Sequence, residues 1–327
     1  MKVIVPISGG KDSQAALLWA IEKYGLKSLV GIFCDVKWEA QETYMHIDYL
    51  VEKSGISFEV LSSEKYDGMV DLAVKKGRFP SSTARFCTEE LKVKPMIDYI
   101  LSLEESIILV DGIRADESEK RSKMLPDCRF FKYYFEPHTT NSIIVSNFKN
   151  LKKKPSLVQR KKYEKALSRL AKGKEDPKYF TYRKKDVFEW CSKYDESLIR
   201  PHFNINADEV IYFSLNRGYE INPRYFKGYS RVGCDPCIME GIEEFSITVE
   251  FSPETIDKIR KAEIRADSSF FPPDKIPKRY HSKKTKEGKT YPTIDDVIRY
   301  VHDRKATGDM FKDEPLFKCK SIYNICE

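Results

Sequence analysis

Six consecutive residues near the start of the chain combine glycines with groups that bind phosphate, namely Ser8-Gly9-Gly10-Lys11-Asp12-Ser13. Glycine lets a backbone approach an anion closely, and Lys11 can neutralise negative charge on phosphates. The hydroxyls of Ser8 and Ser13 can donate hydrogen bonds, and Asp12 can hold a magnesium ion that bridges phosphates. The run differs from the Walker P-loop, which needs two glycines separated by four residues. It predicts a phosphate-binding loop, against the simpler alternative of a strand-to-helix turn.

A second group of reactive residues is the pair Cys234 and Cys237, which are separated by two residues. Two thiolates at this spacing can reach one metal ion. The same spacing also fits a redox pair or two unrelated loop cysteines. An iron-sulfur cluster, zinc and no metal therefore stay open, while Cys34 and Cys191, in apolar surroundings, are expected in the core.

The elements that must position these groups alternate regularly in the first part of the chain. Short apolar runs predict strands, and periodic amphipathic runs predict helices. We expect strands at 3–7, 29–34, 58–61 and 107–110, and helices at 12–23, 39–53, 66–76 and 89–103. This alternation predicts an α/β fold with a doubly wound, mostly parallel sheet. The glycine-rich run then lies at the carboxyl end of the first strand, where such sheets bind ligands, and Asp35 ends the neighbouring strand.

The pattern is less regular beyond about residue 121, and the C-terminal part is expected to be rich in helix. We expect helices at 183–193, 208–217, 253–266 and 293–304, a strand at 245–251 and a proline-rich linker at 271–277. The predicted division is a nucleotide-binding α/β domain at 1–140, a basic insertion at 141–182, a motif region with the cysteine pair at 183–240 and a small C-terminal region at 241–327.

Charge is distributed unevenly. The segment 149–185 has 15 Lys and Arg against 3 Asp and Glu, whereas the rest of the chain has 42 against 47. A second basic stretch, 274–289, has 7 against 2. Such segments can contact the phosphates of a nucleic acid, although runs of like charge are also common on solvated surfaces and in loops. Nucleic acid is therefore a candidate partner through Lys149 to Lys185.

The chain shows neither a signal peptide nor an apolar run long enough to cross a membrane, so we expect a cytoplasmic protein without a membrane partner. Its eight cysteines are few and irregularly spaced in 327 residues. In a reducing compartment they are expected as free thiols, metal ligands or catalytic groups rather than disulfides.

The loop sequence resembles the signature Ser-Gly-Gly-x-Asp-Ser of the PP-loop ATP pyrophosphatases, and it matches that signature at every position. The resemblance implies the adenine nucleotide alpha hydrolase-like fold, with ATP and Mg²⁺ as ligands. Members cleave ATP between the α and β phosphates, adenylylate an acceptor and release pyrophosphate. Besides the loop, it implies that Asp35 and Gly112 lie at the nucleotide and that Lys11, Asp12 and Arg114 act in catalysis.

Four further segments resemble the phosphoadenosine phosphosulfate (PAPS) reductase-like branch of these proteins. They are Asp35 with 42–44, 85–92 with Pro95, 112–118 with Arg121, and 222–225 running into 231–237. The resemblance implies that Lys92, Arg114 and Arg121 bind substrate. Pairing of Arg121 with neighbouring carboxylates is the simpler alternative. It also implies a 4Fe-4S cluster held by Cys87, Cys234 and Cys237, for which Cys128 is the candidate fourth ligand.

Two departures bear on the reaction. PAPS reductases usually alter the loop and place a nucleophilic cysteine in a glycine-containing motif near their C-terminus, whereas this chain keeps Asp12 and has Cys326 without that motif. Both favour ATP activation in sulfur transfer or nucleic-acid modification. The alternatives are a sulfonucleotide reductase that uses Cys326 and a nucleotide-regulated accessory protein that binds nucleic acid.

Overall fold

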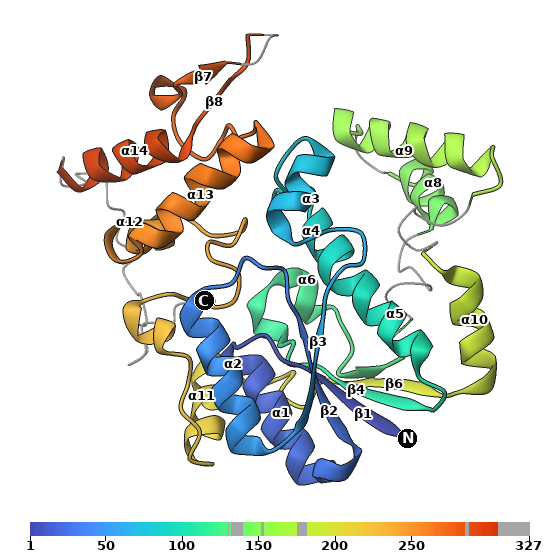
Figure 1. Ribbon diagram of the computed structural model, residues 1–327. Helices are drawn as coiled ribbons and strands as arrows, with labels where there is room; N and C mark the ends of the chain where they lie inside the picture. The colour runs from blue at the N-terminus through green and yellow to red at the C-terminus, as the bar shows by residue number, and fades with distance from the viewer. Residues whose placement is uncertain (130, 132–139, 152–153, 175–181, 285–287, 307–327) are drawn as a thin grey trace.

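The computed structural model describes residues 1–129, 131, 140–151, 154–174, 182–284 and 288–306. At its centre is a six-stranded sheet with the order β3-β2-β1-β4-β6-β5 (Figure 1). The strands are β1 (Lys2–Pro6), β2 (Leu29–Cys34), β3 (Ser57–Leu61), β4 (Ile107–Val110), β5 (Asp127–Cys128) and β6 (Glu196–Ile199). All neighbours are parallel except β5, which pairs antiparallel with β6. The predicted α/β fold with a mostly parallel sheet is confirmed.

Helices cover both faces of this sheet, as the alternation of side chains along β1 requires. Val3 and Val5 pack with α1 (Lys11–Tyr24) and α2 (Gln41–Ser54) on one face. Ile4 packs on the opposite face with α5 (Lys94–Ser102) and α10 (Lys184–Lys193). Because each face has its own apolar cluster, the central strands are buried on both sides.

Shorter elements complete the sheet domain. The stretch predicted as one helix from 89 to 103 begins earlier and is made of α4, a π-helical turn and α5. The remaining helices here are α3 (Met69–Lys76), α4 (Phe86–Thr88), the π turn η2 (Glu89–Val93), α6 (Glu119–Ser122) and α11 (Ala207–Leu215), with 3₁₀ turns η1 (Leu26–Ser28), η3 (Ala115–Glu117) and η5 (Pro223–Lys227).

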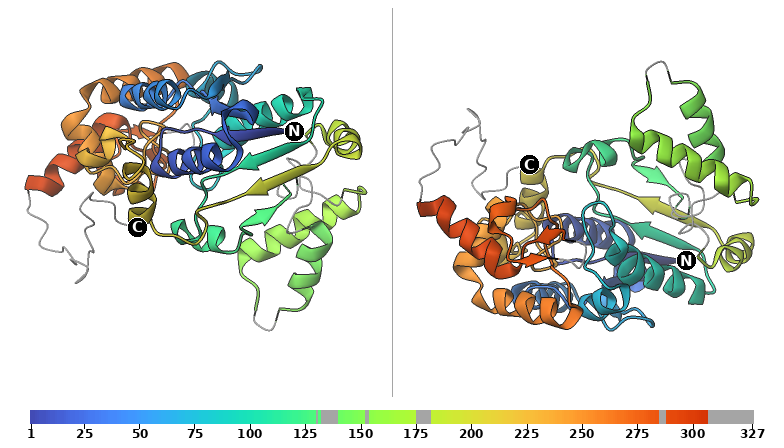
Figure 2. Two further views of the ribbon diagram at one scale, coloured as in Figure 1. Left: turned by 90° about the horizontal axis from the view of Figure 1, so that it is seen from below. Right: turned by 90° about the horizontal axis from the view of Figure 1, so that it is seen from above.

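The C-terminal part forms a helical layer at one end of the molecule (Figures 1 and 2). Phe245, Phe270 and Phe271 form its centre and pack with Trp38 and α3 in one apolar cluster. Its elements are α12 (Ile242–Phe251), α13 (Pro253–Ala266), η6 (Lys278–Tyr280), β7 (Lys283–Lys284), β8 (Thr290–Tyr291) and α14 (Ile294–Ala306). This confirms a C-terminal part rich in helix.

The strand predicted at 245–251 is wrong, because these residues belong to helix α12. The alternating apolar residues suggested a strand, but the helix buries Phe245 and Thr248, which are three positions apart. Phe245 packs edge-to-face on Phe271, with ring centroids 5.0 Å apart. Tertiary packing has therefore overridden the local β preference.

The sheet also extends beyond the predicted domain boundary at residue 140, since β6 lies far later in the chain and pairs with β4. Between β5 and β6 the chain forms α8 (Asn141–Lys149) and α9 (Leu157–Leu170), for which no helices were predicted. In the part of the chain that the structure describes, every helix is too short or too polar to cross a lipid bilayer.

Candidate active site at the carboxyl edge of the sheet

The glycine-rich run connects β1 to α1 at the point where the strand order reverses, between β1 and β4. Gly112, just after β4, lies against the first turn of α1. A Cβ atom on Gly112 would lie 2.5 Å from the carbonyl oxygen of Asp12 and 2.8 Å from the nitrogen of Ser13. Glycine is therefore required here by close packing, and it brings the ends of both strands to one site.

The loop is held in shape by its own serines. The Ser13 hydroxyl donates to the carbonyl oxygen of Gly10 at 2.9 Å and accepts from the Ser8 amide at 3.2 Å. Gly9 has a positive φ of 74°, a conformation that suits glycine. The Asn222 side chain donates to the carbonyl oxygen of Gly9 at 3.1 Å. The loop is thus fixed before any ligand binds.

Tyr225 covers the start of α1. Its hydroxyl accepts a hydrogen bond from the Lys11 amide at 3.1 Å, and the Lys11 ammonium lies 5.4 Å from the centre of its ring. Burial and the nearby Asp12 raise the pKa of Tyr225, so its hydroxyl is neutral. A phosphate bound by this amide would have to displace the Tyr225 hydroxyl.

Asp12 is held by Arg114, the residue predicted both to act in catalysis and to bind substrate. The Arg114 Nε donates to Asp12 Oδ1 at 2.6 Å, and its Nη1 donates to both oxygens of Asp116 at 2.6 and 2.5 Å. The side chain of Arg114 is only 1% exposed. In this arrangement Arg114 orients Asp12, since carboxylates already take its donors.

The other predicted basic residues form contacts with carboxylates. Arg121 forms an ion pair with Glu117, as the simpler alternative for this residue anticipated. Lys92 lies 3.8 Å from Glu39 and 4.0 Å from the sulfur of Cys234. The nearby Cys234 and Glu39 raise the pKa of Lys92, so it remains an ammonium group.

Asp35 follows β2 at the same edge of the sheet, as expected. Its Oδ1 accepts from the Tyr44 hydroxyl at 2.7 Å and from the Lys37 amide at 2.7 Å. The first contact ties the end of β2 to α2. Asp35 therefore has a structural role that is compatible with a second role at a nucleotide.

Three of the four predicted cluster ligands lie in one region of the molecule, although not close enough to form a metal site, and the fourth lies elsewhere. Burial raises the pKa of Cys234 to about 12 against the opposing charge of Lys92, and Glu39, Cys237 and Cys87 contribute to this rise. Cys128 instead lies on β5, where its sulfur accepts from Arg200 at 3.8 Å and its side chain packs with the apolar cluster on the α5 face. The structure thus separates Cys128 from the other three.

The described residues do not fit the predicted four-cysteine cluster. Among them, no group of three or more His, Cys, Asp or Glu side chains is placed to hold a metal ion. Cys326, the nucleophile of the alternative reductase reaction, lies outside the described residues.

His202 is a candidate site residue that sequence reasoning missed. It follows β6 at the same sheet edge and is 5% exposed, and neither ring nitrogen has a hydrogen-bond partner among the described residues. Burial lowers its pKa to about 4, while the nearby Asp12 opposes this shift. A lone histidine after a strand carries no distinctive sequence signal, so only the fold identifies it.

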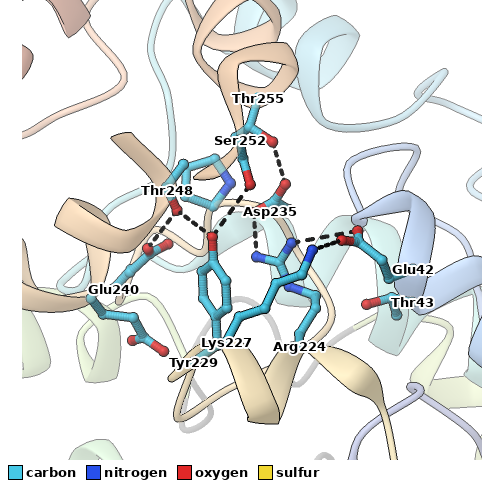
Figure 3. A network of polar contacts seen from close by, with 12 residues as sticks. Glu42, Thr43, Arg224, Lys227, Tyr229, Asp235, Glu240, Thr248, Ser252 and Thr255 are labelled. Carbon is cyan, nitrogen blue, oxygen red and sulfur yellow. Dashed lines mark hydrogen bonds and ion pairs between the residues drawn. The ribbon is translucent and has the colours of Figure 1, made fainter. Parts of the chain in front are cut away.

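A buried polar network joins the site to the C-terminal helices (Figure 3). Arg224, in the turn that carries Tyr225, donates from Nη2 to Asp235 Oδ1 at 2.6 Å, and Asp235 also accepts from Thr255 on α13. Glu42 on α2 pairs with Arg224 at 3.8 Å and with Lys227 at 2.5 Å. The network holds Tyr225 and the loop that carries Cys234 and Cys237, here called the cysteine loop, between α2 and α13.

Comparison with known proteins matches residues 2–127 to the phosphoadenosine phosphosulfate reductase domain. A protein of Escherichia phage 186, described as an uncharacterized 37.8 kDa protein in the gpa 5' region, is 27% identical over 330 residues, which cover 84% of this chain and 80% of that protein.

Among solved structures, the chain is similar to the PAPS reductase of Candida auris in its phosphate complex. The TM-score is 0.40 and the identity 12%, over 72% of this chain and 81% of that one. It is also similar to the U34-tRNA thiolase NcsA of Methanococcus maripaludis with its 4Fe-4S cluster. The TM-score is 0.35 and the identity 13%, over 92% of this chain and 80% of that one. TM-scores this low carry no argument about the site.

Proposed function

We propose that the chain binds ATP at the Ser8–Ser13 loop and cleaves it between the α and β phosphates, a proposal supported by the match of residues 2–127 to the phosphoadenosine phosphosulfate reductase domain. An oxygen of an acceptor attacks the α phosphorus, and the bond from that phosphorus to the bridging oxygen breaks. Pyrophosphate leaves with the electron pair, and the proton of the acceptor passes to solvent. The products are an adenylylated acceptor, ready for sulfur transfer or another modification, and pyrophosphate.

The observation that supports this proposal is that the Ser8–Ser13 loop and the Asp12–Arg114 ion pair lie together beside β1 and β4, where the strand order of the sheet reverses. Backbone amides at the start of α1 favour an anion, and Lys11 adds a positive charge there. Arg114 holds the Asp12 carboxylate in one orientation. A magnesium ion bound with ATP would supply further neutralisation of the phosphates, with Asp12 as its candidate protein ligand.

The role of Arg114 in this proposal is positioning rather than contact with phosphate. Its guanidinium is buried and bridges Asp12 and Asp116, so it fixes Asp12 relative to Lys11. Charge stabilisation on the leaving pyrophosphate then comes from the Lys11 ammonium and the loop amides. His202, whose ring nitrogens have no partner among the described residues, is a candidate contact for the bound nucleotide or acceptor.

The test is exchange of labelled pyrophosphate into ATP, together with direct measurement of nucleotide affinity. We expect Lys11→Gln and Asp12→Asn to lower the exchange rate by about a hundredfold. Lys23→Gln, an exposed lysine at the other end of α1, is the matched control and should leave exchange unchanged. Two results together would refute the proposal. The parent protein would show neither pyrophosphate exchange nor pyrophosphate release with any acceptor, and Asp12→Asn would bind ATP as tightly as the parent does.

A further inference from the structure

The short turn η5 lies between the Ser8–Ser13 loop and the cysteine loop, and it contacts both. On one side, the Tyr225 hydroxyl accepts from the Lys11 amide at 3.1 Å. On the other side, Arg224 donates to Asp235 of the cysteine loop at 2.6 Å (Figure 3). Two neighbouring residues of one turn therefore bind the two loops at the same time.

Tyr225 has little room to leave the Lys11 amide by rotation of its side chain alone. It is 2% exposed and packs in an apolar cluster with Ile211 and Ile221. An interior packed this closely does not admit a new rotamer of a large ring unless its neighbours move. A phosphate oxygen that takes the Lys11 amide therefore displaces the turn that carries Tyr225.

The start of the turn is fixed by Asn222. Its side chain donates to the carbonyl oxygen of Gly9 at 3.1 Å and accepts from the Arg224 amide at 3.0 Å, and its carbonyl oxygen accepts from the Tyr225 amide at 3.1 Å. Displacement of Tyr225 therefore turns the segment about Asn222 and moves Arg224 with it. This movement lengthens the contact between Arg224 and Asp235.

A second contact connects the two loops without the turn. Val232, two residues before Cys234, packs with the apolar cluster around Tyr225. Its Cγ2 atom lies 3.5 Å from the position that a Cβ atom would take on Gly10. Movement of the Tyr225 ring therefore also changes the packing of the segment that leads into Cys234.

The cysteine loop is held from two sides. Asp235 accepts from Arg224 on the side of the Ser8–Ser13 loop and from Thr255 on the side of α13. The sulfur of Cys234 lies 3.7 Å from a carboxylate oxygen of Glu39, and the residue is half-buried. When the Arg224 contact lengthens, Asp235 stays attached on the α13 side only. The chain at Cys234 then shifts and exposes its sulfur.

We propose that η5 makes the reactivity of Cys234 depend on a bound nucleotide. A phosphate on the Lys11 amide displaces Tyr225, and Cys234 becomes accessible to other molecules. This inference rests on the ATP site proposed above, and it sets an order, in which thiol chemistry at Cys234 follows ATP binding. Because coupling between two sites is reciprocal, opening of the cysteine loop also raises the affinity for ATP.

The test measures alkylation of each cysteine by iodoacetamide, followed by mass spectrometry of the peptides, with and without α,β-methylene ATP and magnesium. This analogue cannot be cleaved between its α and β phosphates, so occupancy of the loop is separated from the reaction. We expect saturating analogue to raise the alkylation rate of Cys234 by about fivefold or more. Cys191, on α10 at the α5 face of the sheet, is the internal control and should react at an unchanged rate.

Tyr225→Phe keeps the packed ring and leaves the Lys11 amide open, so the analogue binds without displacing η5. We expect this variant to bind the analogue at least as tightly as the parent, while the alkylation rate of Cys234 changes by less than about twofold on binding. Tyr229→Phe is the matched control, because it also loses a buried hydroxyl and keeps its ring against Arg224. It should respond to the analogue as the parent does.

Calorimetric titration with the same analogue separates the two proposals. If the parent binds the analogue and Cys234 does not react faster, the inference about η5 is wrong while the ATP site stands. The same holds if Tyr225→Phe responds as the parent does, or if Cys191 is accelerated equally. If the parent does not bind the analogue, the ATP site itself is wrong, and the inference about η5 fails with it.

Discussion

The Tyr225 hydroxyl accepts a hydrogen bond from the Lys11 amide at 3.1 Å. In the proposed reaction this amide donates to a phosphate oxygen of ATP instead. Tyr225→Phe keeps the ring and removes this competitor, so we expect ATP to bind about two- to tenfold more tightly, the worth of one net hydrogen bond. Calorimetric titration with ATP and magnesium measures it.

The matched control is Tyr229→Phe, which removes another buried hydroxyl, one that contacts Thr248 away from the loop. This variant should bind ATP as the parent does. Weaker binding by Tyr225→Phe would mean that the hydroxyl contacts the nucleotide instead of competing with it.

A second residue-scale prediction concerns Glu240, a buried carboxyl group beside the cysteine loop. Burial, and then repulsion from Glu244 and Asp235, raises its pKa to about 8. Between its ordinary pKa of 4.5 and about 8, the folded state binds more protons than the unfolded state, so the free energy of unfolding falls as the pH rises through this window.

Glu240→Gln should make the decrease in the free energy of unfolding across this pH range smaller by about 1–4 kcal/mol. Urea unfolding at a series of pH values measures the effect, and Glu254→Gln, an exposed residue on α13, is the control. An unchanged pH profile in Glu240→Gln would show that Glu240 ionises normally in the folded protein.

At the scale of elements, the contact between the end of β4 and the first turn of α1 decides where Asp12 lies. Gly112→Ala would place a Cβ atom 2.6 Å from the carbonyl carbon of Asp12, and that atom belongs to the backbone, so the helix must shift. We expect a loss of about 1–3 kcal/mol in the free energy of unfolding and at least a tenfold loss of ATP affinity.

The comparison for this element is Gly241→Ala, since no atom lies within 4 Å of the Cβ position there and the backbone has a negative φ of −73°. Gly241 is the N-cap of α12, where alanine is less favourable than glycine, but alanine also lowers the conformational entropy of the unfolded chain, so the net change in stability should be less than about 1 kcal/mol. Equal effects of the two substitutions would contradict a steric role for Gly112.

At the scale of the whole molecule, the buried pair of Arg224 and Asp235 joins the sheet domain to the C-terminal helices (Figure 3). Both side chains are 4% exposed. Asp235→Ala removes the hydrogen-bonded carboxylate from the buried guanidinium and leaves Glu42 at 3.8 Å, so we expect a loss of about 3–5 kcal/mol in the free energy of unfolding.

The exposed pair of Asp257 and Arg260 is the control, and Asp257→Ala should cost no more than about 1 kcal/mol. Urea unfolding followed by circular dichroism measures both. The double variant Arg224→Met/Asp235→Ala should recover part of the loss, and no recovery would mean that the Asp235 contact with Thr255 dominates instead.

The sequence by itself determined the first half of the fold and the location of its loop. The strands at 29–34 and 107–110 were predicted with their observed bounds, and the β1–α1 connection carries the glycine-rich run at the predicted edge. These features depend on local patterns: buried strands read as short apolar runs, helices repeat every 3.6 residues, and parallel strands end at one edge.

Only the tertiary structure decided which distant groups share the site. It placed Tyr225 on the Lys11 amide, closed Arg114 onto Asp12, separated Cys128 from Cys234, and turned the predicted strand at 245–251 into helix α12. The physical reason is that these contacts join segments far apart in the chain or depend on packing partners supplied by other elements. Local periodicity contains no information about which of those partners will meet.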